Sequence, residues 1–161
     1  MEPLYTDPSR CAQWLSTLAS YEGTPFCHGG RSKRRGVDCV GFVCGALVEC
    51  GFAARVVPVD LSPGWQRGQE VEPVRDIVQD QIDLLNPGMG CEVHFPAPDL
   101  MPGDILFLYL RARWRAYHMA VWVGDYALHA METVGVTRWP LDRKNMARVA
   151  GIGRLMWATG S

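Results

Sequence analysis

The chain has 161 residues, of which 48% are hydrophobic and 20% are charged. This balance is typical of a globular protein with its own core, and the length suits a single domain over residues 1–161. The formal net charge of −1 excludes a strong overall attraction to nucleic acid. No apolar run reaches the roughly 18–20 residues of a membrane-spanning helix, so we expect no membrane span.

The N-terminal segment MEPLYTDPSR is polar and broken by prolines. It lacks the basic and apolar parts of a secretory signal, so we expect synthesis in the cytoplasm. The six cysteines of a chain made there are expected to be free thiols rather than disulfides. They form no CxxC pair, and no histidine pair stands at ligand spacing. We therefore expect no metal or other cofactor.

Hydrophobic periodicity predicts helices in the first half of the chain. Residues 8–20 repeat apolar side chains at helical spacing. A second helix is expected from Asp38, a good N-cap, to a stop at Gly51. Residues 70–85 form a third amphipathic pattern, and the proline- and glycine-rich segment 86–104 is expected to be a connection.

The second half of the chain changes to short segments rich in β-forming residues. Strands are predicted over ILFLYL, YHMAVWV and YALHAM, with a turn between the last two, and over VTRWPL and GIGRLMW near the end. Helices followed by a meander of antiparallel strands indicate an α+β fold.

Asp38 as N-cap places Cys39 in the first turn of its helix. Free backbone N–H groups and the helix dipole stabilise negative charge there, so we expect a lowered pKa for the Cys39 thiol and a reactive thiolate. Gly41 keeps the surface beside it uncrowded. The competing interpretation is that Cys39 is a small buried hydrophobe, as we expect for Cys44 on the apolar stripe of the same helix.

A nucleophilic cysteine needs a base. If Gly124-Asp125 is a two-residue turn, Ala120 faces His129, and His118 and His129 are diagonal neighbours on one face of the hairpin. This is the arrangement of a catalytic base and the group that orients it. Two satisfied histidines on a half-buried sheet are the other interpretation, and a one-residue slip in register would separate the rings.

Together these residues resemble the NlpC-type papain-like cysteine peptidases that cut peptidoglycan. The matching segments, over roughly residues 20–50 and 101–131, are GTPFCHGG leading into GVDCVGFV, then PGDILFL, and then HMAVWVGDYALHA. The resemblance implies a papain-like fold in which N-terminal helices, with the nucleophile at a helix N-terminus, pack on a C-terminal antiparallel sheet. It also implies a Cys-His-His triad, with Cys39 the nucleophile, His118 the base and His129 the third polar residue.

The short form of the domain, with GTPFCHGGRSKRRGVDCVGFV near its front, looks most like the versions in tailed phages and gene transfer agents. This likeness implies delivery on a phage or phage-like tail for penetration of the cell wall. The partners would then be peptidoglycan and tail tip or hub proteins, and the location would be the virion. Residues 52–100 have no clear counterpart in the family.

One residue departs from the family pattern. The family usually has a tyrosine where Phe26 stands, and the hydroxyl that contacts the active site is missing here. His28 or a backbone N–H is a candidate to supply the lost donor. By this resemblance, Phe26, His28 and Asp38 are expected to line the substrate site.

Two basic runs precede the proposed catalytic residues in the sequence. One contains Arg35, and the other spans residues 111–115. Stem peptides carry free carboxylates, which these side chains would pair with if the runs lie at the rim of the cleft. The alternative is that both runs are solvated loops.

Three other functions stay open. The first is a different acyl-transfer enzyme on the same scaffold, such as an amidase or acyltransferase. The second is a structural tail component that has kept the fold but lost turnover, which Phe26 favours. The third is a metal-binding module that uses Cys27, His28, Cys39 and Cys91. Asp104, in the PGD segment, is expected to be a turn residue rather than a catalytic acid.

Overall fold

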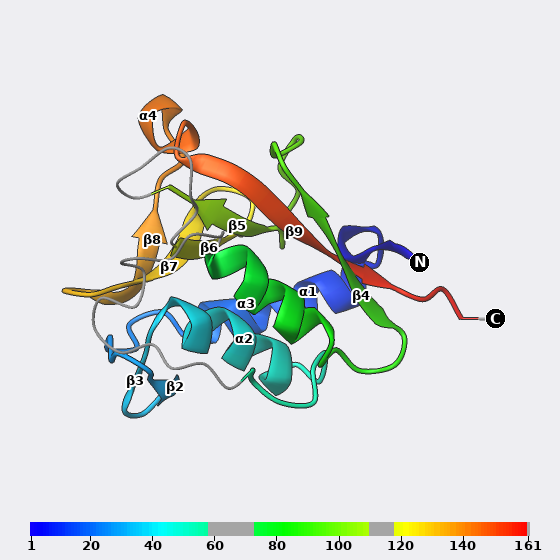
Figure 1. Ribbon diagram of the computed structural model, residues 1–161, viewed down its shortest axis with the longest axis horizontal. Coiled ribbons are helices and arrows are strands. Elements are labelled where there is room, and N and C mark those ends of the chain that lie inside the picture. Colours follow the sequence, from blue (N-terminus) through cyan, green and yellow to red (C-terminus); the bar gives the residue numbers. More distant parts are fainter. Residues whose placement is uncertain (58–72, 110–117, 161) are drawn as a thin grey trace.

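The computed structural model describes residues 1–57, 73–109 and 118–160. Three helices lie on one side of an antiparallel sheet, as Figure 1 shows: α1 (Pro8–Ser20), α2 (Cys39–Glu49) and α3 (Pro73–Ile82). A short helix, α4 (Arg143–Met146), lies at the opposite end of the molecule. None of the helices in the described part of the chain is long and apolar enough to cross a membrane.

The two N-terminal helices begin where the sequence predicts. Asp7 caps α1, and its Oδ1 accepts hydrogen bonds from the backbone N–H groups of Ser9 and Arg10 at 2.9 and 3.0 Å. Asp38 caps α2 in the same way. These carboxylates satisfy N–H groups that have no partner inside the helix, which fixes where each helix begins.

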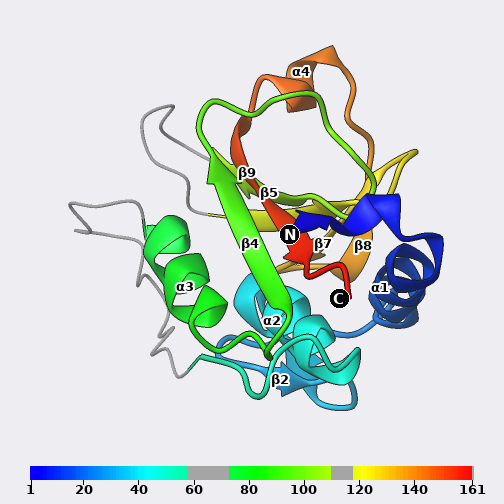
Figure 2. The same ribbon diagram turned by 90° about the vertical axis from the view of Figure 1, so that its right-hand side faces the viewer.

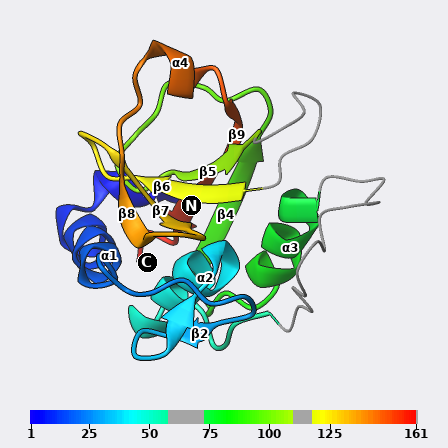
Figure 3. The same cartoon turned by 90° about the vertical axis from the view of Figure 1, so that its left-hand side faces the viewer.

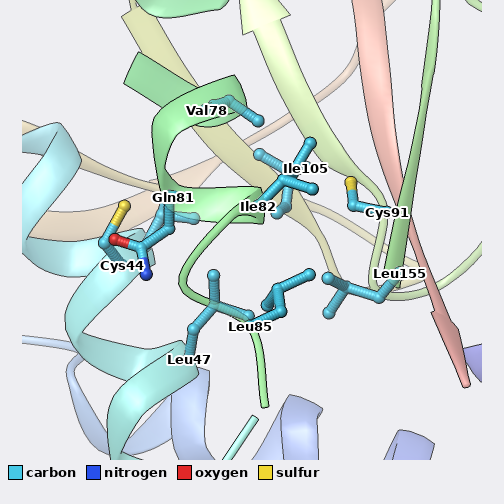
Figure 4. Close-up of a pocket in the computed structure, with 10 residues that line it drawn as sticks. Cys44, Leu47, Val78, Gln81, Ile82, Leu85, Cys91, Ile105 and Leu155 are labelled. Carbon is cyan, nitrogen blue, oxygen red and sulfur yellow. The ribbon is translucent and has the colours of Figure 1, made fainter. Parts of the chain in front are cut away.

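Helix α3 covers a further part of the core, within the predicted amphipathic segment 70–85. Its buried side chains pack against α2 and the sheet around a narrow pocket lined by aliphatic and sulfur-containing residues, shown in Figure 4. Gln81 is the polar member of this lining. Its side-chain amide donates to the Arg55 carbonyl and accepts from the Val57 N–H, both at 2.8 Å, so the group is buried without loss of hydrogen bonds.

Seven of the described strands form one antiparallel sheet in the order β1-β9-β5-β6-β7-β8, with β4 paired to β9. Their bounds are β1 (Glu2–Pro3), β4 (Met89–His94), β5 (Ile105–Leu108), β6 (His118–Trp122), β7 (Ala127–Met131), β8 (Gly135–Trp139) and β9 (Val149–Trp157). A separate two-stranded ribbon consists of β2 (Arg31–Ser32) and β3 (Gly36–Val37). The strands predicted from sequence are therefore confirmed, and so is the α+β order.

The prediction that residues 86–104 are only a connection is wrong, because β4 lies within this segment. β4 pairs with β9 from Met89↔Trp157 to His94↔Ile152, and Figure 2 shows the two strands side by side. The long strand β9 carries β4 on one edge and β5 on the other, since Gly153 pairs with both Val93 and Ile105. The sheet is consequently not a simple meander.

The two faces of the sheet bury different clusters of side chains. Met119 and Val121 of β6 belong to the larger cluster, which includes the helices, whereas Ala120 packs with Leu106 and Ile152 on the other face. This alternation along β6 is the one predicted from its sequence.

Asp104 is a buried structural residue in the turn before β5, as expected. Its carboxylate accepts two hydrogen bonds from the Arg154 guanidinium, at 2.9 and 2.7 Å, and one from the Met101 N–H at 2.8 Å. Only 2% of the Asp104 side chain is exposed. The pair ties the start of β5 to β9, beside the strands that carry the histidines.

We predict that Asp104→Asn lowers the free energy of unfolding by about 3 kcal/mol, because it leaves the largely buried Arg154 cation uncompensated. Urea unfolding followed by circular dichroism measures the change. Glu22→Gln is the matched control. It breaks the exposed Glu22–Arg138 ion pair and should cost less than about 1 kcal/mol. Equal losses in the two variants would contradict this account.

Candidate active site

Cys39 is the first residue of α2, directly after the N-cap Asp38. It is 6% exposed and lies in the cluster between the helices and the sheet. Figure 3 shows α2 beneath β6 and β7, and the helix contacts both strands. The helix therefore packs against the two strands that carry the histidines.

The Asp38 carboxylate holds the loop before α2 against the start of the helix. It accepts hydrogen bonds from the Gly29 N–H at 2.8 Å, the Gly41 N–H at 2.7 Å and the Arg31 guanidinium at 2.9 Å. The residue is 4% exposed. These contacts within the protein give Asp38 a positioning role. A direct contact between Asp38 and substrate stays a prediction.

Gly41 is required by this close packing. A Cβ atom at this position would lie 1.9 Å from the Gly30 carbonyl oxygen, far inside van der Waals contact. The sequence predicted that Gly41 would keep the surface beside Cys39 uncrowded. In the structure, the absence of a side chain at Gly41 instead allows the loop to pack against the first turn of α2. The loop and Cys39 are thereby held in one fixed arrangement.

The predicted histidine pair is present. Val121 pairs with Leu128 and Trp122 with Ala127, and the Val123 N–H donates to the Tyr126 carbonyl at 3.0 Å. This is the register that the Gly124-Asp125 turn predicted. Further from the turn, His118 Nε2 and His129 Nδ1 lie 3.1 Å apart, with ring planes at 68°. The two rings thus form one hydrogen-bonded unit.

The sulfur of Cys39 lies against the end of β6 where His118 stands. The backbone N–H groups of Met119 and Val40 donate hydrogen bonds to it and lower its pKa. Since Met119 directly follows His118, the sulfur lies next to the backbone position that carries the first imidazole. His118 turns Nε2 to His129, which leaves Nδ1 as its other ring nitrogen.

The predicted lowering of the Cys39 pKa is wrong for the substrate-free protein. Burial raises the pKa of this thiol to about 12, and the nearby Asp38 charge raises it further. The backbone donors and Arg31 oppose this rise but are outweighed, because desolvation disfavours the thiolate more than the helix N-terminus favours it. The resting cysteine is a protonated thiol.

Burial also keeps both imidazoles neutral. It lowers the pKa of His118 to about 3, with a smaller contribution from His129, and that of His129 to about 4. Burial therefore favours a neutral thiol at Cys39 and neutral imidazoles at His118 and His129 before substrate binds.

We predict that the protein loses stability in acid because of these two histidines. Their folded-state pKa values lie below the unfolded value of about 6.5, so the unfolded chain binds more protons as the pH falls. The two neutral histidines contribute fully to the free energy of unfolding above pH ~6.5, and this contribution is lost toward pH ~4. The free energy of unfolding falls by about 1.4 kcal/mol per pH unit for each histidine that is protonated on unfolding.

Urea unfolding at pH 7, 6 and 5 measures this dependence. His129→Gln should have the shallower slope, because it removes one titrating group and keeps a hydrogen-bonding side chain. Val134→Gln is the control, since Val134 is exposed and carries no titratable group, and it should keep the wild-type slope. A slope that is unchanged in His129→Gln would contradict the assignment.

The other predicted substrate residues lie on the segment before α2. Phe26 is half-buried, bridges to Val37 and meets the His28 ring edge-on at 5.0 Å between centroids. His28 Nε2 lies 3.3 Å from a carboxylate oxygen of Glu132, in the β7–β8 turn. Arg35 is exposed. These observations do not test contact with substrate, so the roles of Phe26, His28 and Arg35 in substrate binding stay predictions.

The basic run before α2 is divided between two environments. Arg31 pairs with Asp38 and Lys33 with Glu49, whereas Arg34 and Arg35 are exposed. The second basic run, residues 111–115, lies outside the described residues.

The metal-binding hypothesis is not supported by the geometry of the described residues. Among them, no three histidine, cysteine or carboxylate side chains are placed to share a metal ion. Cys91 lies in β4, not in a loop, and lines the pocket of Figure 4, whereas Cys39 is at the N-terminus of α2. All six cysteines are free thiols.

Sequence reasoning missed one aromatic side chain at the site. Trp139 of β8 stacks on His129, with ring centroids 5.3 Å apart and planes at 24°. Pairing of Ala127 with Trp139 makes His129 the diagonal neighbour of the indole. The β-forming residues of VTRWPL indicated a strand, but only its register against β7 reveals the contact.

Comparison with known proteins supports the resemblance to the NlpC/P60 peptidases. No protein-family model matches the chain. The chain is 28% identical over 126 residues to the probable endopeptidase NlpC of Escherichia coli K12, a match that covers 78% of this chain and 64% of that protein. The match thus spans less than two thirds of that relative's length.

Solved structures show the same fold. The NlpC/p60 domain of the peptidoglycan hydrolase SagA superposes with a TM-score of 0.53 at 21% identity, over 88% of this chain and 97% of that one. An NLP/P60-family protein similar to a lipoprotein, from Staphylococcus aureus Mu50, gives 0.56 at 18% identity, over 95% and 43%. An NlpC/P60-family protein from Bacillus cereus gives 0.54 at 19%, over 88% and 39%. The fold is that of NlpC/P60 peptidase domains, and the predicted papain-like architecture is confirmed.

Proposed function

We propose that this chain is a cysteine endopeptidase that hydrolyses amide bonds in peptidoglycan stem peptides. The observation that carries the proposal is the hydrogen-bonded His118–His129 pair, together with the contact of the next residue's backbone, the Met119 N–H, with the sulfur of a helix-terminal cysteine. The match to a probable endopeptidase and the fold shared with a peptidoglycan hydrolase domain support the substrate class.

The hydrogen bond between the rings decides which tautomer is active. If His118 donates its Nε2–H to His129 Nδ1, then His118 Nδ1 carries a lone pair and can accept the Cys39 proton. The opposite tautomer would occupy Nδ1 of His118 with a proton and prevent this step. His129 therefore acts as the acceptor that selects the basic tautomer of His118 and stabilises the imidazolium that forms.

The reaction then proceeds by acyl transfer to sulfur. As the thiol proton passes to His118 Nδ1, the sulfur attacks the amide carbonyl carbon, and His118 returns the proton to the leaving amine as the C–N bond breaks. Water hydrolyses the thioester by the reverse proton path and regenerates the thiol. The backbone N–H of Cys39, which has no partner inside the helix, is a candidate donor to the oxyanion.

We predict that Cys39→Ala abolishes release of stem-peptide fragments from purified peptidoglycan, with a loss of at least about 10³-fold in rate. Mass spectrometry of the soluble products measures release and names the cleaved bond. Cys27→Ala is the matched control, because Cys27 is an exposed thiol and its loss should leave the rate within about twofold.

Release by Cys39→Ala at the wild-type rate would assign the nucleophile elsewhere. No release by the wild-type protein from walls of several chemotypes would overturn the peptidoglycan proposal. Cleavage of another amide substrate that depends on Cys39 would then favour an amidase or acyltransferase on the same scaffold.

A second candidate function is a structural component that keeps the fold without turnover. Two observations favour it: Phe26 lacks the hydroxyl usual at this position, and the pKa of Cys39 is raised.

We predict that Phe26→Tyr increases the rate of fragment release about tenfold or more if the hydroxyl supplies a missing donor. The Phe26→Leu variant separates this effect from ring packing. A rate that is unchanged in Phe26→Tyr would show that another group already supplies the donor.

We also propose that a phage-like tail delivers the enzyme to the wall, with tail tip or hub proteins as partners. The support for delivery is the likeness of the segment 23–43 to the short tail-borne peptidases. Mass spectrometry of purified tail particles from cells that express the chain tests this. Stoichiometric presence in the particles is expected, and its confinement to particle-free fractions would contradict tail delivery.

A further inference from the structure

The histidine pair has a third partner. Trp139 reaches it from β8, and its indole lies nearly parallel to the His129 ring, while His118 meets the same imidazole at a steep angle. His129 is 5% exposed, and Trp139 packs with the cluster on the face of the sheet that includes Ala127 and Ala120. One face of the His129 imidazole is thus occupied by an aromatic surface.

This stack restricts how the imidazole can turn. A rotation of the His129 ring about its Cβ–Cγ bond would move Nδ1 away from His118 Nε2 and push the ring edge into the indole. Since the ring has two nitrogens with different roles, a flipped or tilted imidazole would offer His118 the wrong atom. The indole therefore favours the orientation in which Nδ1 accepts from His118.

The stack also favours positive charge on the pair. When His118 accepts the thiol proton, the imidazolium charge is shared through the hydrogen bond with His129. An aromatic face attracts a cation, and tryptophan does so most strongly of the aromatic side chains. Burial favours neutral imidazoles before the reaction. The interaction of the indole with the histidine pair therefore becomes more favourable as positive charge develops on the pair.

We propose that Trp139 is a positioning residue of the active site, which fixes the orientation of His129 and supports the charge that forms on the histidine pair during turnover. This inference rests on the proposed peptidase function for its kinetic consequence, but the orientation of His129 can be measured without any substrate. Trp139 does not touch the reacting atoms in this account and acts through His129.

The test compares Trp139→Phe and Trp139→Leu with wild type. Long-range ¹H–¹⁵N NMR of the imidazole nitrogens identifies the tautomer of each histidine in the free protein. We expect wild type and Trp139→Phe to show a protonated Nε2 on His118 and an unprotonated Nδ1 on His129. Trp139→Leu should show averaged tautomers.

Kinetics with a stem-peptide substrate give the second readout. In Trp139→Leu, kcat should fall about tenfold while KM stays within about twofold of wild type. Trp139→Phe should keep most of the wild-type kcat.

Trp122→Leu is the matched control. It removes a half-buried tryptophan from the same cluster, at the end of β6 away from His118. Its tautomers and kcat should stay as in wild type. Wild-type tautomers and kcat in Trp139→Leu, or equal losses of kcat in the two leucine variants without a change of tautomer, would overturn the proposal.

Replacement of the tryptophans by fluorinated analogues keeps their shape and weakens their attraction for cations, which covers the case in which Trp139→Leu does not fold. We expect kcat to fall with each added fluorine in wild type and to show no such dependence in Trp139→Phe. A flat response in wild type would overturn the charge-supporting role. If wild type releases nothing from any wall while the tautomers of Trp139→Leu are averaged, the peptidase proposal fails and the positioning of His129 by Trp139 stands.

Discussion

The hydrogen bond between His118 Nε2 and His129 Nδ1 is the contact on which the chemistry of this site depends. It uses one nitrogen of each ring and leaves the other nitrogen of His118 available for the proton transfer that we propose. The sheet makes this contact possible because the tight β6–β7 turn places both rings on one face. The capped start of α2 then brings a thiol to the same strand end. The fold and the proposed reaction are linked at this point, since a one-residue slip of the hairpin would remove the proposed base.

Burial determines the protonation state of the site before substrate binds. The helix N-terminus and the backbone donors favour a thiolate at Cys39, but desolvation and the Asp38 charge outweigh them. The neutral imidazoles follow from the same low-dielectric surroundings. In the reaction that we propose, charges form only as the thiol proton moves, so the groups that support a transient cation matter more than those that stabilise a resting ion pair. The indole of Trp139 is placed to be such a group.

Much of this arrangement could be predicted from local sequence. Asp38 before an apolar stripe indicated the helix and the place of Cys39, and the Gly124-Asp125 turn gave the histidine register. The prediction failed where the outcome depends on tertiary burial or non-local pairing. The pKa of Cys39 reverses because α2 is packed against β6, which the helix sequence cannot show. β4 was missed because its pairing depends on β9, about sixty residues later in the chain. Trp139 was missed because its contact with His129 depends on the register of β8 against β7.

The most direct test of the central claim is to trap the acyl-enzyme. Wild type and His118→Ala would be mixed with a stem-peptide substrate and quenched in acid, and the intact mass and peptide map would locate any adduct. The account predicts a mass increase equal to the acyl part of the substrate, on Cys39, in wild type and not in His118→Ala. An adduct on another residue, or equal adduct formation without His118, would contradict the assignment of the thiol and its base.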